Sequence, residues 1–141
     1  MEQQNVIFLS LGANLGNREE TLQKAIAMLN EFVGETVAVS SFFYSEAEGF
    51  VSEHSFCNLC LKLTSPLDLK SLLTQTQAIE KKLGRDTKTN FGKHSDRTID
   101  IDILFFNQLS YSDSEITVPH PMWNQRKFVY LPLIELVSKG L

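Results

Sequence analysis

Two aspartates separated by a single residue, Asp100 and Asp102, are the side chains of this sequence best suited to chemistry. They alternate with Ile99, Ile101 and Ile103, and β-branched residues at every second position predict a strand. Because successive side chains of a strand point to opposite faces, the two carboxylates share one face and the isoleucines share the other. Two like charges held so close favour a cation between them, and Mg²⁺ binds carboxylate oxygens while leaving room for phosphates.

Arg97 precedes the aspartate pair by three residues, and further basic residues stand upstream of it. Carboxylates that hold a hard cation, beside arginines that bind phosphate oxygens, predict metal-assisted phosphoryl chemistry. The alternative is a half-exposed edge strand with solvated aspartates, which is less favourable because aspartate is depleted in strands.

The elements that must position these residues follow from the hydrophobic pattern. Period-two alternation and short apolar runs predict strands, and apolar residues at helical spacing predict helices. In chain order we expect a strand at 6–11, a helix from Asn17 to Gly34, strands at 35–43 and 55–63, a helix from Pro66 to Gly84, and a strand at 97–104. The order βαββαβ is that of a ferredoxin-like α+β sandwich, and residues 116–141 add further short elements.

Both predicted helices carry end signals. Asn17 can cap the first helix with Glu20 as its reciprocal partner, and Pro66 suits the first position of the second helix. Gly34 and Gly84 are expected to end the two helices.

The glycine-containing segment 12–16 follows a strand and precedes a helix. It lacks both the Gly-Lys-Ser/Thr of a P-loop and the spacing of a dinucleotide-binding turn. We therefore expect a loop that needs unusual backbone angles, and its evidence for phosphate binding is weak.

Cys57 and Cys60 have the spacing of a redox pair or half a zinc site. Their segment is predicted to be a strand, in which residues three apart face opposite ways. We therefore expect two buried or half-buried thiols that do not meet.

Phe56 and Asn58 share one face of the same predicted strand. A flat apolar ring beside an amide suits a planar heterocycle, which needs stacking and edge hydrogen bonds. Taken alone, the pair is better explained as ordinary polar and aromatic decoration of a sheet.

The length and composition of the chain limit the kinds of protein to which these motifs can belong. A chain of 141 residues with 43% hydrophobic side chains predicts one domain, 1–141, with a core of its own. A net charge of −4 gives no general attraction to nucleic acid or to an anionic membrane. No signal segment or membrane span is recognisable, so we expect a cytoplasmic protein, and we expect it to be a monomer.

Several segments together resemble the 6-hydroxymethyl-7,8-dihydropterin pyrophosphokinase family of folate biosynthesis. The segment from Asp96 to Leu104 is similar to the family signature, in which an arginine and two further residues precede Asp-aliphatic-Asp-aliphatic. Other segments match in order along nearly the whole chain, namely Leu9–Gly16, Val39–Phe42, Phe56–Asn58, Gln77–Glu80, Leu83–Arg85, Val118–Pro121 and Arg126–Val129. Separated motifs in the right order are more specific than any single motif.

The resemblance implies a ferredoxin-like enzyme that transfers pyrophosphate from ATP to the pterin hydroxymethyl group and releases AMP. It implies two Mg²⁺ ions held by Asp100 and Asp102, with Arg97 and Arg85 as further catalytic residues. The implied ATP-binding residues are Gln77, Glu80, Arg85, Lys88, Lys93, Arg97, Ile103, His120 and Arg126. The implied pterin-binding residues are Ser45, Ala47, Glu48, Phe56, Asn58 and Phe128, with the two phenylalanines on either side of the ring.

The sequence departs from the family before the signature arginine. Members often carry Trp-Gly-Pro there, whereas this chain has His94, Ser95 and Asp96. The segment 85–97 is longer by about two residues, and we expect the longer C-terminal region of some members to be absent. The loop 85–96 is expected to be mobile when empty and to close over ATP.

Three other functions stay open on the sequence alone. Ferredoxin-like domains also serve as RNA-binding modules or as non-catalytic small-ligand sensors, and a metal-dependent phosphohydrolase would use the same aspartates. RNA binding would require aromatic side chains within a basic surface, and the aspartate pair opposes a phosphate backbone. A sensor would not need Asp100 and Asp102 beside Arg97, so Asp102→Ala should remove most of the turnover of an enzyme and change the binding of a pure binder little.

Overall fold

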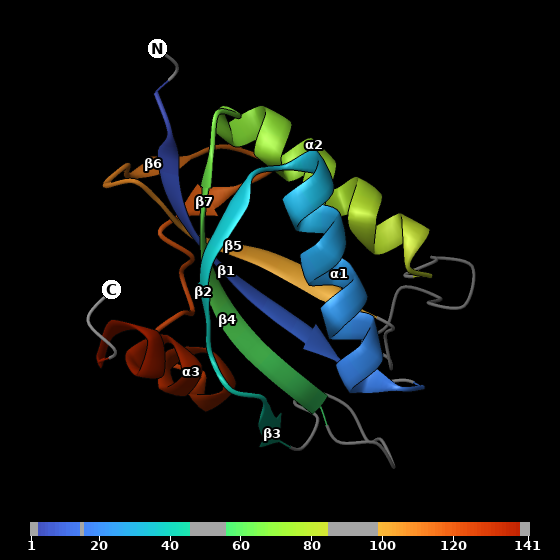
Figure 1. Ribbon diagram of the computed structural model, residues 1–141. Helices are drawn as coiled ribbons and strands as arrows, with labels where there is room; N and C mark the ends of the chain where they lie inside the picture. Colours follow the sequence, from blue (N-terminus) through green and yellow to red (C-terminus); the bar gives the residue numbers. More distant parts are fainter. Residues whose placement is uncertain (1–2, 15, 46–55, 85–98, 139–141) are drawn as a thin grey trace.

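The computed structural model of the chain describes residues 3–14, 16–45, 56–84 and 99–138 (Figure 1). Its elements are β1 (Asn5–Ala13), α1 (Arg18–Phe32), β2 (Glu35–Val39), β3 (Phe43–Ser45), β4 (Phe56–Ser65), α2 (Leu69–Lys82), β5 (Asp100–Phe106), β6 (Tyr111–Ser112), β7 (Thr117–Val118) and α3 (Lys127–Ser138). The predicted order of strands and helices is confirmed, with the strand expected at 35–43 divided into β2 and β3.

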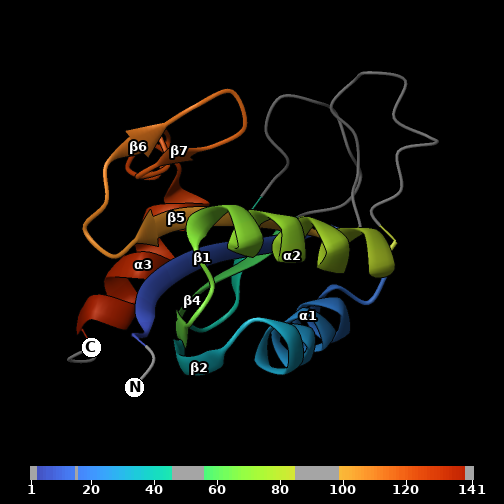
Figure 2. The ribbon, with the colours of Figure 1, turned by 90° about the horizontal axis from the view of Figure 1, so that it is seen from above.

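The main sheet has the strand order β2-β4-β1-β5, and β3 also pairs with β4. All of its pairings are antiparallel. This order confirms the predicted ferredoxin-like α+β fold. Figures 1 and 2 show three layers, in which α1 and α2 cover one face of the sheet while α3 lies against the other.

The larger core lies between the sheet and the helices α1 and α2. It receives alternate residues of the three long strands, and Ile99, Ile101 and Ile103 are at most 6% exposed. The prediction that these isoleucines share a buried face is therefore confirmed. The other fully buried large side chains of this core are Ile7, Leu9, Leu11, Leu22, Leu29, Leu59, Leu61, Leu63, Leu72 and Ile79.

The starts of the two helices confirm one expectation and correct another. The Asn17 side chain accepts the backbone N–H of Glu20 at 3.1 Å, so the predicted N-cap of α1 is confirmed. The prediction that Pro66 opens the second helix is wrong. Asp68 is the cap and accepts the N–H of Ser71 at 2.8 Å, which leaves the proline outside α2.

The two glycines expected at the helix ends serve different purposes. Gly84 follows α2 with a φ of +99°, the left-handed conformation that ends many helices. Gly34 follows the cap of α1 at Val33, and a Cβ at this glycine would lie 1.9 Å from the carbonyl oxygen of Thr64. Gly34 is therefore required by the close approach of two backbones.

The segment 12–16 was expected to be a loop, but Gly12 and Ala13 belong to β1. Gly12 is paired on both sides, with Asn58 of β4 and with Asp100 of β5. The sequence pattern missed this extension because a glycine carries no side chain to contribute to the alternation.

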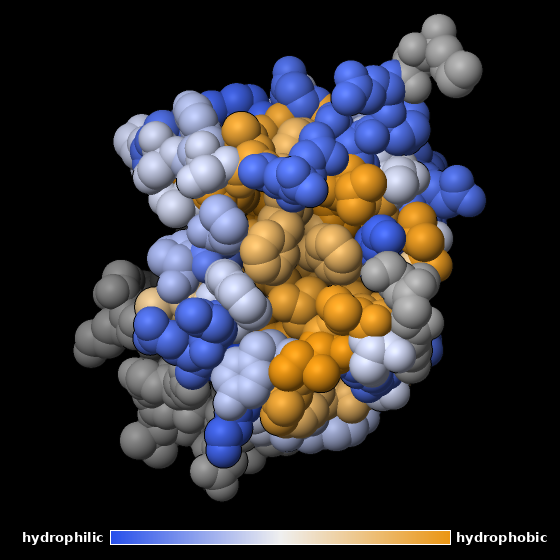
Figure 3. Space-filling view, turned by 90° about the vertical axis from the view of Figure 1, so that its left-hand side faces the viewer, coloured by the Kyte–Doolittle hydropathy of each residue, from blue (hydrophilic) through white to orange (hydrophobic). Residues whose placement is uncertain are grey.

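Helix α3 was not predicted as a helix. Pro132 lies inside it, which obscures the pattern because proline usually interrupts helices. Val129, Leu133 and Leu136 nevertheless recur at helical spacing and bury themselves against Cys60 and other residues of the sheet. The outer side of α3 stays apolar, with Leu131, Ile134 and Val137 exposed (Figure 3).

The hairpin β6–β7 is attached to α2 by an ion-pair cluster. The Lys70 ammonium binds Asp113, which lies between the two strands, and also binds Glu115 at 2.8 Å. The cluster therefore joins the hairpin to α2 at the surface of the molecule.

Asp113→Asn should lower the midpoint of thermal unfolding at neutral pH and flatten its dependence on pH in acid. The Lys70 ammonium and nearby N–H groups hold the pKa of Asp113 well below its usual range. Because the unfolded chain then binds more protons, the stabilisation is present above a pH of about 4 and is lost as the pH falls further. Thermal unfolding of the wild type and of Asp113→Asn from pH 2 to pH 6 checks this. The same change of unfolding midpoint with pH in both proteins would contradict it.

Among the described residues, no helix is long and apolar enough to span a membrane.

Candidate active site

The face of the sheet opposite α1 and α2, called the site face below, carries polar side chains from neighbouring strands. In the strand register, Asp100 of β5 lies opposite Gly12 of β1, and Gly12 lies opposite Asn58 of β4. Asn58 lies opposite Phe43 of β3. Opposed residues of antiparallel strands point to the same face, so one row runs from a carboxylate across a glycine and an amide to an aromatic ring.

The second aspartate stands in the next row of the same face. Asp102 lies opposite Ser10, and both aspartates are half-buried, whereas Ile101 between them is buried on the other side. The predicted shared face of Asp100 and Asp102 is therefore confirmed. Their spacing along the strand places the two Cα atoms about 7 Å apart, close enough for both side chains to serve one metal-phosphate group.

His120 and Arg126 belong to the surroundings of Asp102. The backbone N–H of His120 donates to the carbonyl oxygen of Leu104 at 2.9 Å, which fixes the histidine beside β5. Burial lowers the pKa of His120 and the charge of Arg126 lowers it further, while the Asp102 carboxylate acts in the opposite direction. The histidine is therefore neutral at physiological pH.

The tautomer of that neutral histidine follows from its neighbour. Its Nδ1 accepts the backbone N–H of Met122 at 3.0 Å, so the ring proton resides on Nε2. His120 therefore offers one N–H donor, which suits a phosphate oxygen.

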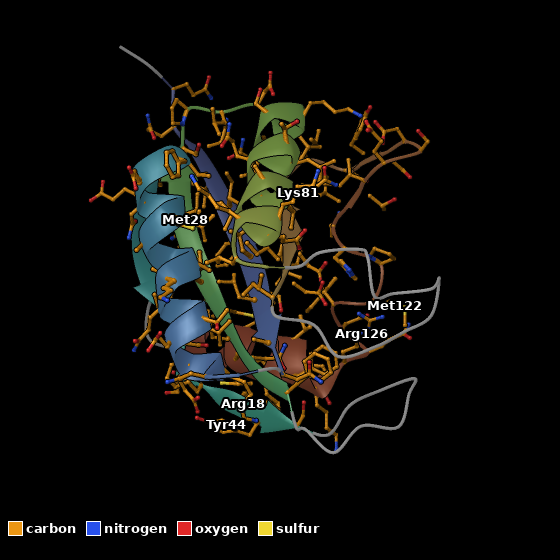
Figure 4. The ribbon with its side chains drawn as sticks, turned by 90° about the vertical axis from the view of Figure 1, so that its right-hand side faces the viewer. Arg18, Met28, Tyr44, Lys81, Met122 and Arg126 are labelled. Carbon is orange, nitrogen blue, oxygen red and sulfur yellow. The ribbon has the colours of Figure 1, made fainter. Side chains whose placement is uncertain are left out.

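Arg126 is held at the start of α3. Its carbonyl oxygen accepts the N–H groups of Val129 and Tyr130 at 3.0 and 2.9 Å. Its guanidinium carbon lies 5.9 Å from the centre of the Phe128 ring. Figure 4 shows Arg126 beside Met122, whereas Arg18 and Tyr44 lie together near the start of α1. The start of α3 thus holds a guanidinium close to an aromatic ring.

The other end of the row contains polar atoms that lack partners. The Oδ1 atom of Asn58 and the Oγ atom of Ser45 are buried without a hydrogen-bond partner in the described part of the chain. Asn58 is only 4% exposed, and Ser45 lies opposite Phe56 on the same face. A buried polar atom without a partner costs about 1–3 kcal/mol, so these two atoms indicate a place prepared for a ligand with complementary polar edges.

Gly12 separates the carboxylates from this amide. A Cβ at this position would lie 2.4 Å from Nδ2 of Asn58, so no larger residue fits while the amide keeps its place. Gly12 was predicted only to lie in a loop, because its neighbour Asn58 belongs to a strand far along the chain. The glycine leaves the space in which a heterocycle and a phosphate chain could approach each other.

The two aromatic side chains expected to contact the pterin lie on β4 and at the start of α3. Phe56 is half-buried on β4, and Phe128 is half-buried in the first turn of α3. The helix is attached to the same strand, because the Cys60 thiol donates to the carbonyl oxygen of Val129 at 3.3 Å. The placement of a ring between the two phenylalanines stays a prediction.

The sequence is similar to that of known proteins over most of its length. A family model described as 7,8-dihydro-6-hydroxymethylpterin-pyrophosphokinase (HPPK) matches residues 8–138. The chain belongs to this family. A 2-amino-4-hydroxy-6-hydroxymethyldihydropteridine pyrophosphokinase from Porphyromonas gingivalis is 43% identical over 132 residues, which are 93% of this chain and 90% of that relative. The protein of the same name from Bacillus subtilis is 36% identical over 136 residues, which are 96% of this chain and 80% of that relative.

Solved structures add evidence on the fold of HPPK. A crystal structure of Plasmodium falciparum HPPK-DHPS superposes with a TM-score of 0.78 at 16% identity. The match covers 97% of this chain and 42% of that larger chain. The likeness shows that the sandwich seen here is the fold of an HPPK domain.

Three residues expected to bind ATP from the HPPK resemblance lie on the helix side of the sheet. Gln77 is exposed on α2, and Glu80, one turn later, is 8% exposed. Ile103 is 5% exposed, and its side chain belongs to the core beneath the helices. A contact of Ile103 with ATP would therefore have to use its backbone.

The remaining expected residues of the HPPK site lie outside the described residues. They are Arg85, Lys88, Lys93 and Arg97 of the phosphate-binding set, and Ala47 and Glu48 of the pterin-binding set. The loop 85–96, expected to close over ATP, lies outside them as well.

The carboxylates of Asp100 and Asp102 are ligands of the kind that magnesium prefers. Within residues 99–138 and the other described ranges, no group of three or more His, Cys, Asp or Glu side chains could hold a metal by itself. Mg²⁺ is commonly bound by one or two carboxylates together with substrate phosphates and water. The pair Asp100 and Asp102 supplies that kind of incomplete shell, which a triphosphate would complete.

The two cysteines take no part in this HPPK site chemistry. Cys57 is buried in the core beneath the helices, and Cys60 is buried under α3. Their thiols therefore lie on opposite faces of the sheet and form no disulfide with each other, as predicted. Burial raises the pKa of Cys60 to about 12, which keeps its thiol protonated and unreactive.

Proposed function

We propose that this protein transfers a diphosphate group from ATP to the hydroxymethyl group of 6-hydroxymethyl-7,8-dihydropterin, producing AMP and the pterin diphosphate for folate biosynthesis. One observation supports this most strongly. A carboxylate pair suited to a metal-bound phosphate lies on one face with a buried amide whose Oδ1 atom has no partner among the described residues, and only Gly12 separates Asp100 from this amide.

At the phosphate end, Asp100 and Asp102 would hold two Mg²⁺ ions on the triphosphate. When bound, these ions offset the charge of the transferring group and lower the pKa of a nearby hydroxyl. Arg126 and the Nε2–H of His120 would bind phosphate oxygens, which their positions near Asp102 support.

At the pterin end, Asn58 and Ser45 would satisfy their unpartnered atoms with the polar edge of the ring. An amide offers one acceptor and two donors, which matches a ring edge that carries both kinds of group. Phe56 and Phe128 would stack on the two sides of the ring, and Ala47 and Glu48 complete the proposed pterin set.

The other proposed contacts concern the triphosphate and the nucleotide. Arg85 and Arg97 would neutralise the charge that develops during transfer, and Lys88 and Lys93 would bind phosphates. Gln77, Glu80 and Ile103 are proposed for the nucleotide, with Ile103 using its backbone because its side chain is buried in the core.

Product analysis tests the proposal. The protein is incubated with ATP, Mg²⁺ and 6-hydroxymethyl-7,8-dihydropterin, and the products are separated by chromatography. We expect AMP and a pyrophosphorylated pterin in equal amounts. A phosphohydrolase would release phosphate without modified pterin, and a sensor would bind the ligands without forming AMP, so either result would overturn the proposal.

We also propose that the protein is a monomer and is located in the cytoplasm. Exposed Leu131, Ile134 and Val137 on α3 form the surface most suited to self-association, which makes the monomer worth measuring. Light scattering should give a mass close to 16.0 kDa, and a mass twice as large would contradict the monomer.

A further inference from the structure

A buried carboxylate on α2 is attached to the strand that carries the two aspartates. The Oε2 atom of Glu80 accepts the backbone N–H of Ile101 at 2.7 Å. The Glu80 residue is 8% exposed, and burying an ionised group is costly unless it is well hydrogen-bonded. A hydrogen bond between a carboxylate and a backbone N–H is about twice as strong as one between neutral groups.

The hydrogen bond between Glu80 and the Ile101 amide lies at the edge of β5 that is unpaired in the described chain. β5 stands at the end of the sheet order, so within the described chain only one of its edges is paired, with β1. That pairing holds Asp100 and Asp102 through Gly12 and Ser10. Glu80 binds the open edge at the residue between the two aspartates.

The strand segment 100–102 is therefore held from both sides. β1 fixes it through the sheet, and Glu80 fixes it from α2. An edge strand without the second contact could bend or twist, which would change the separation of the two carboxylates. Metal-binding carboxylates tolerate such a change poorly, because groups that orient the ligands contribute strongly to metal affinity.

We propose that Glu80 is a positioning residue for the metal site, acting through its hydrogen bond to the Ile101 amide. The inference rests on the proposed function, because it assigns Asp100 and Asp102 to Mg²⁺. It gives Glu80 a role that direct contact with ATP does not explain, since its Oε2 atom is engaged by the strand and its side chain is buried.

Three substitutions separate the hydrogen bond from the charge. Glu80→Gln keeps an oxygen at the same distance but removes the charge. Glu80→Asp keeps the charge but withdraws the oxygen by one methylene. Glu80→Met keeps the bulk and removes both the charge and the acceptor, and if it fails to fold, the other two variants still decide the matter.

The main measurement is the Mg²⁺ concentration that gives half-maximal binding of a non-hydrolysable ATP analogue. We expect Glu80→Asp and Glu80→Met to raise it about 10- to 100-fold, the range found when groups that orient metal ligands are removed. Glu80→Gln should stay close to the wild type. Amide hydrogen exchange at Ile101 should accelerate in Glu80→Asp and Glu80→Met, and it should not change in Glu80→Gln.

Two controls exclude a general loss of structure. Binding of 6-hydroxymethyl-7,8-dihydropterin without nucleotide, followed by fluorescence, should be unchanged in all three variants. Glu135→Met is the matched control, because the Glu135 carboxylate of α3 also accepts a backbone N–H, that of Ser41 at 2.8 Å, on the other side of the sheet. This variant should leave the Mg²⁺ dependence unchanged.

The outcomes distinguish this inference from the proposed function. Wild-type Mg²⁺ dependence in all three variants would overturn the positioning role while leaving the function standing. An equal loss in Glu80→Gln and Glu80→Met, with Glu80→Asp unaffected, would overturn it in favour of simple charge. Wild-type protein that binds the analogue equally well without Mg²⁺ would overturn the proposed metal chemistry itself.

Discussion

Asp102→Asn should lower the rate of AMP formation by on the order of 10³-fold. The substitution keeps the size of the side chain but replaces the charged carboxylate proposed to bind metal with a neutral amide beside His120. Charge stabilisation by a bound metal contributes several kcal/mol to transfer of a phosphoryl group, and each 1.4 kcal/mol corresponds to about a factor of ten. Asp100→Asn should behave in the same way, because Asp100 points to the same face.

The measurement is the initial rate of AMP formation at saturating ATP and pterin over a range of Mg²⁺ concentrations. Asp113→Asn is the matched control, because it removes one aspartate charge at the β6–β7 hairpin and should retain activity near the wild-type level. Pterin binding in the absence of nucleotide should survive in Asp102→Asn. A loss of less than about tenfold would mean that the aspartate pair is not the metal site.

The aspartate pair could be placed from the sequence because its evidence is local. Ile99, Ile101 and Ile103 alternate with the acidic residues, and strand geometry alone then puts both carboxylates on one face. The capping of α1 by Asn17 is local in the same way, because the cap and its partner are three residues apart. Such features need no knowledge of the remaining chain.

Other parts of the site depend on contacts between distant segments. Asn58 is opposed to Gly12 only because β4 and β1 pair in one particular register, and nothing in either segment alone specifies that register. The bond from the Ile101 amide to Glu80 links a helix to a strand edge, and no periodic pattern reports it. The same is true of α3, in which Pro132 argues against a helix and whose apolar residues are explained only by packing against the second face of the sheet.

Gly12→Ala should weaken binding of the pterin by about 10- to 100-fold while leaving the protein folded. The added Cβ would lie 2.4 Å from Nδ2 of Asn58, so the amide must turn or shift. Displacing a buried amide from its ligand costs about 1–3 kcal/mol for each group left without a partner, which corresponds to that range. A change from glycine to alanine in a strand is otherwise mildly favourable, because alanine has less backbone freedom to lose on folding.

Gly34 provides a control that separates a specific loss of pterin binding from a general loss of stability. At Gly34 an added Cβ would meet the carbonyl oxygen of Thr64, so Gly34→Ala should lower thermal stability without a selective effect on the pterin. Fluorescence titration with the pterin and thermal unfolding of both variants give the comparison. Asn58→Ala should weaken binding about as much as Gly12→Ala, and the double variant should be little worse than either, because both changes remove the same amide contact. Fully additive losses would show that Gly12 acts on the ligand independently of Asn58.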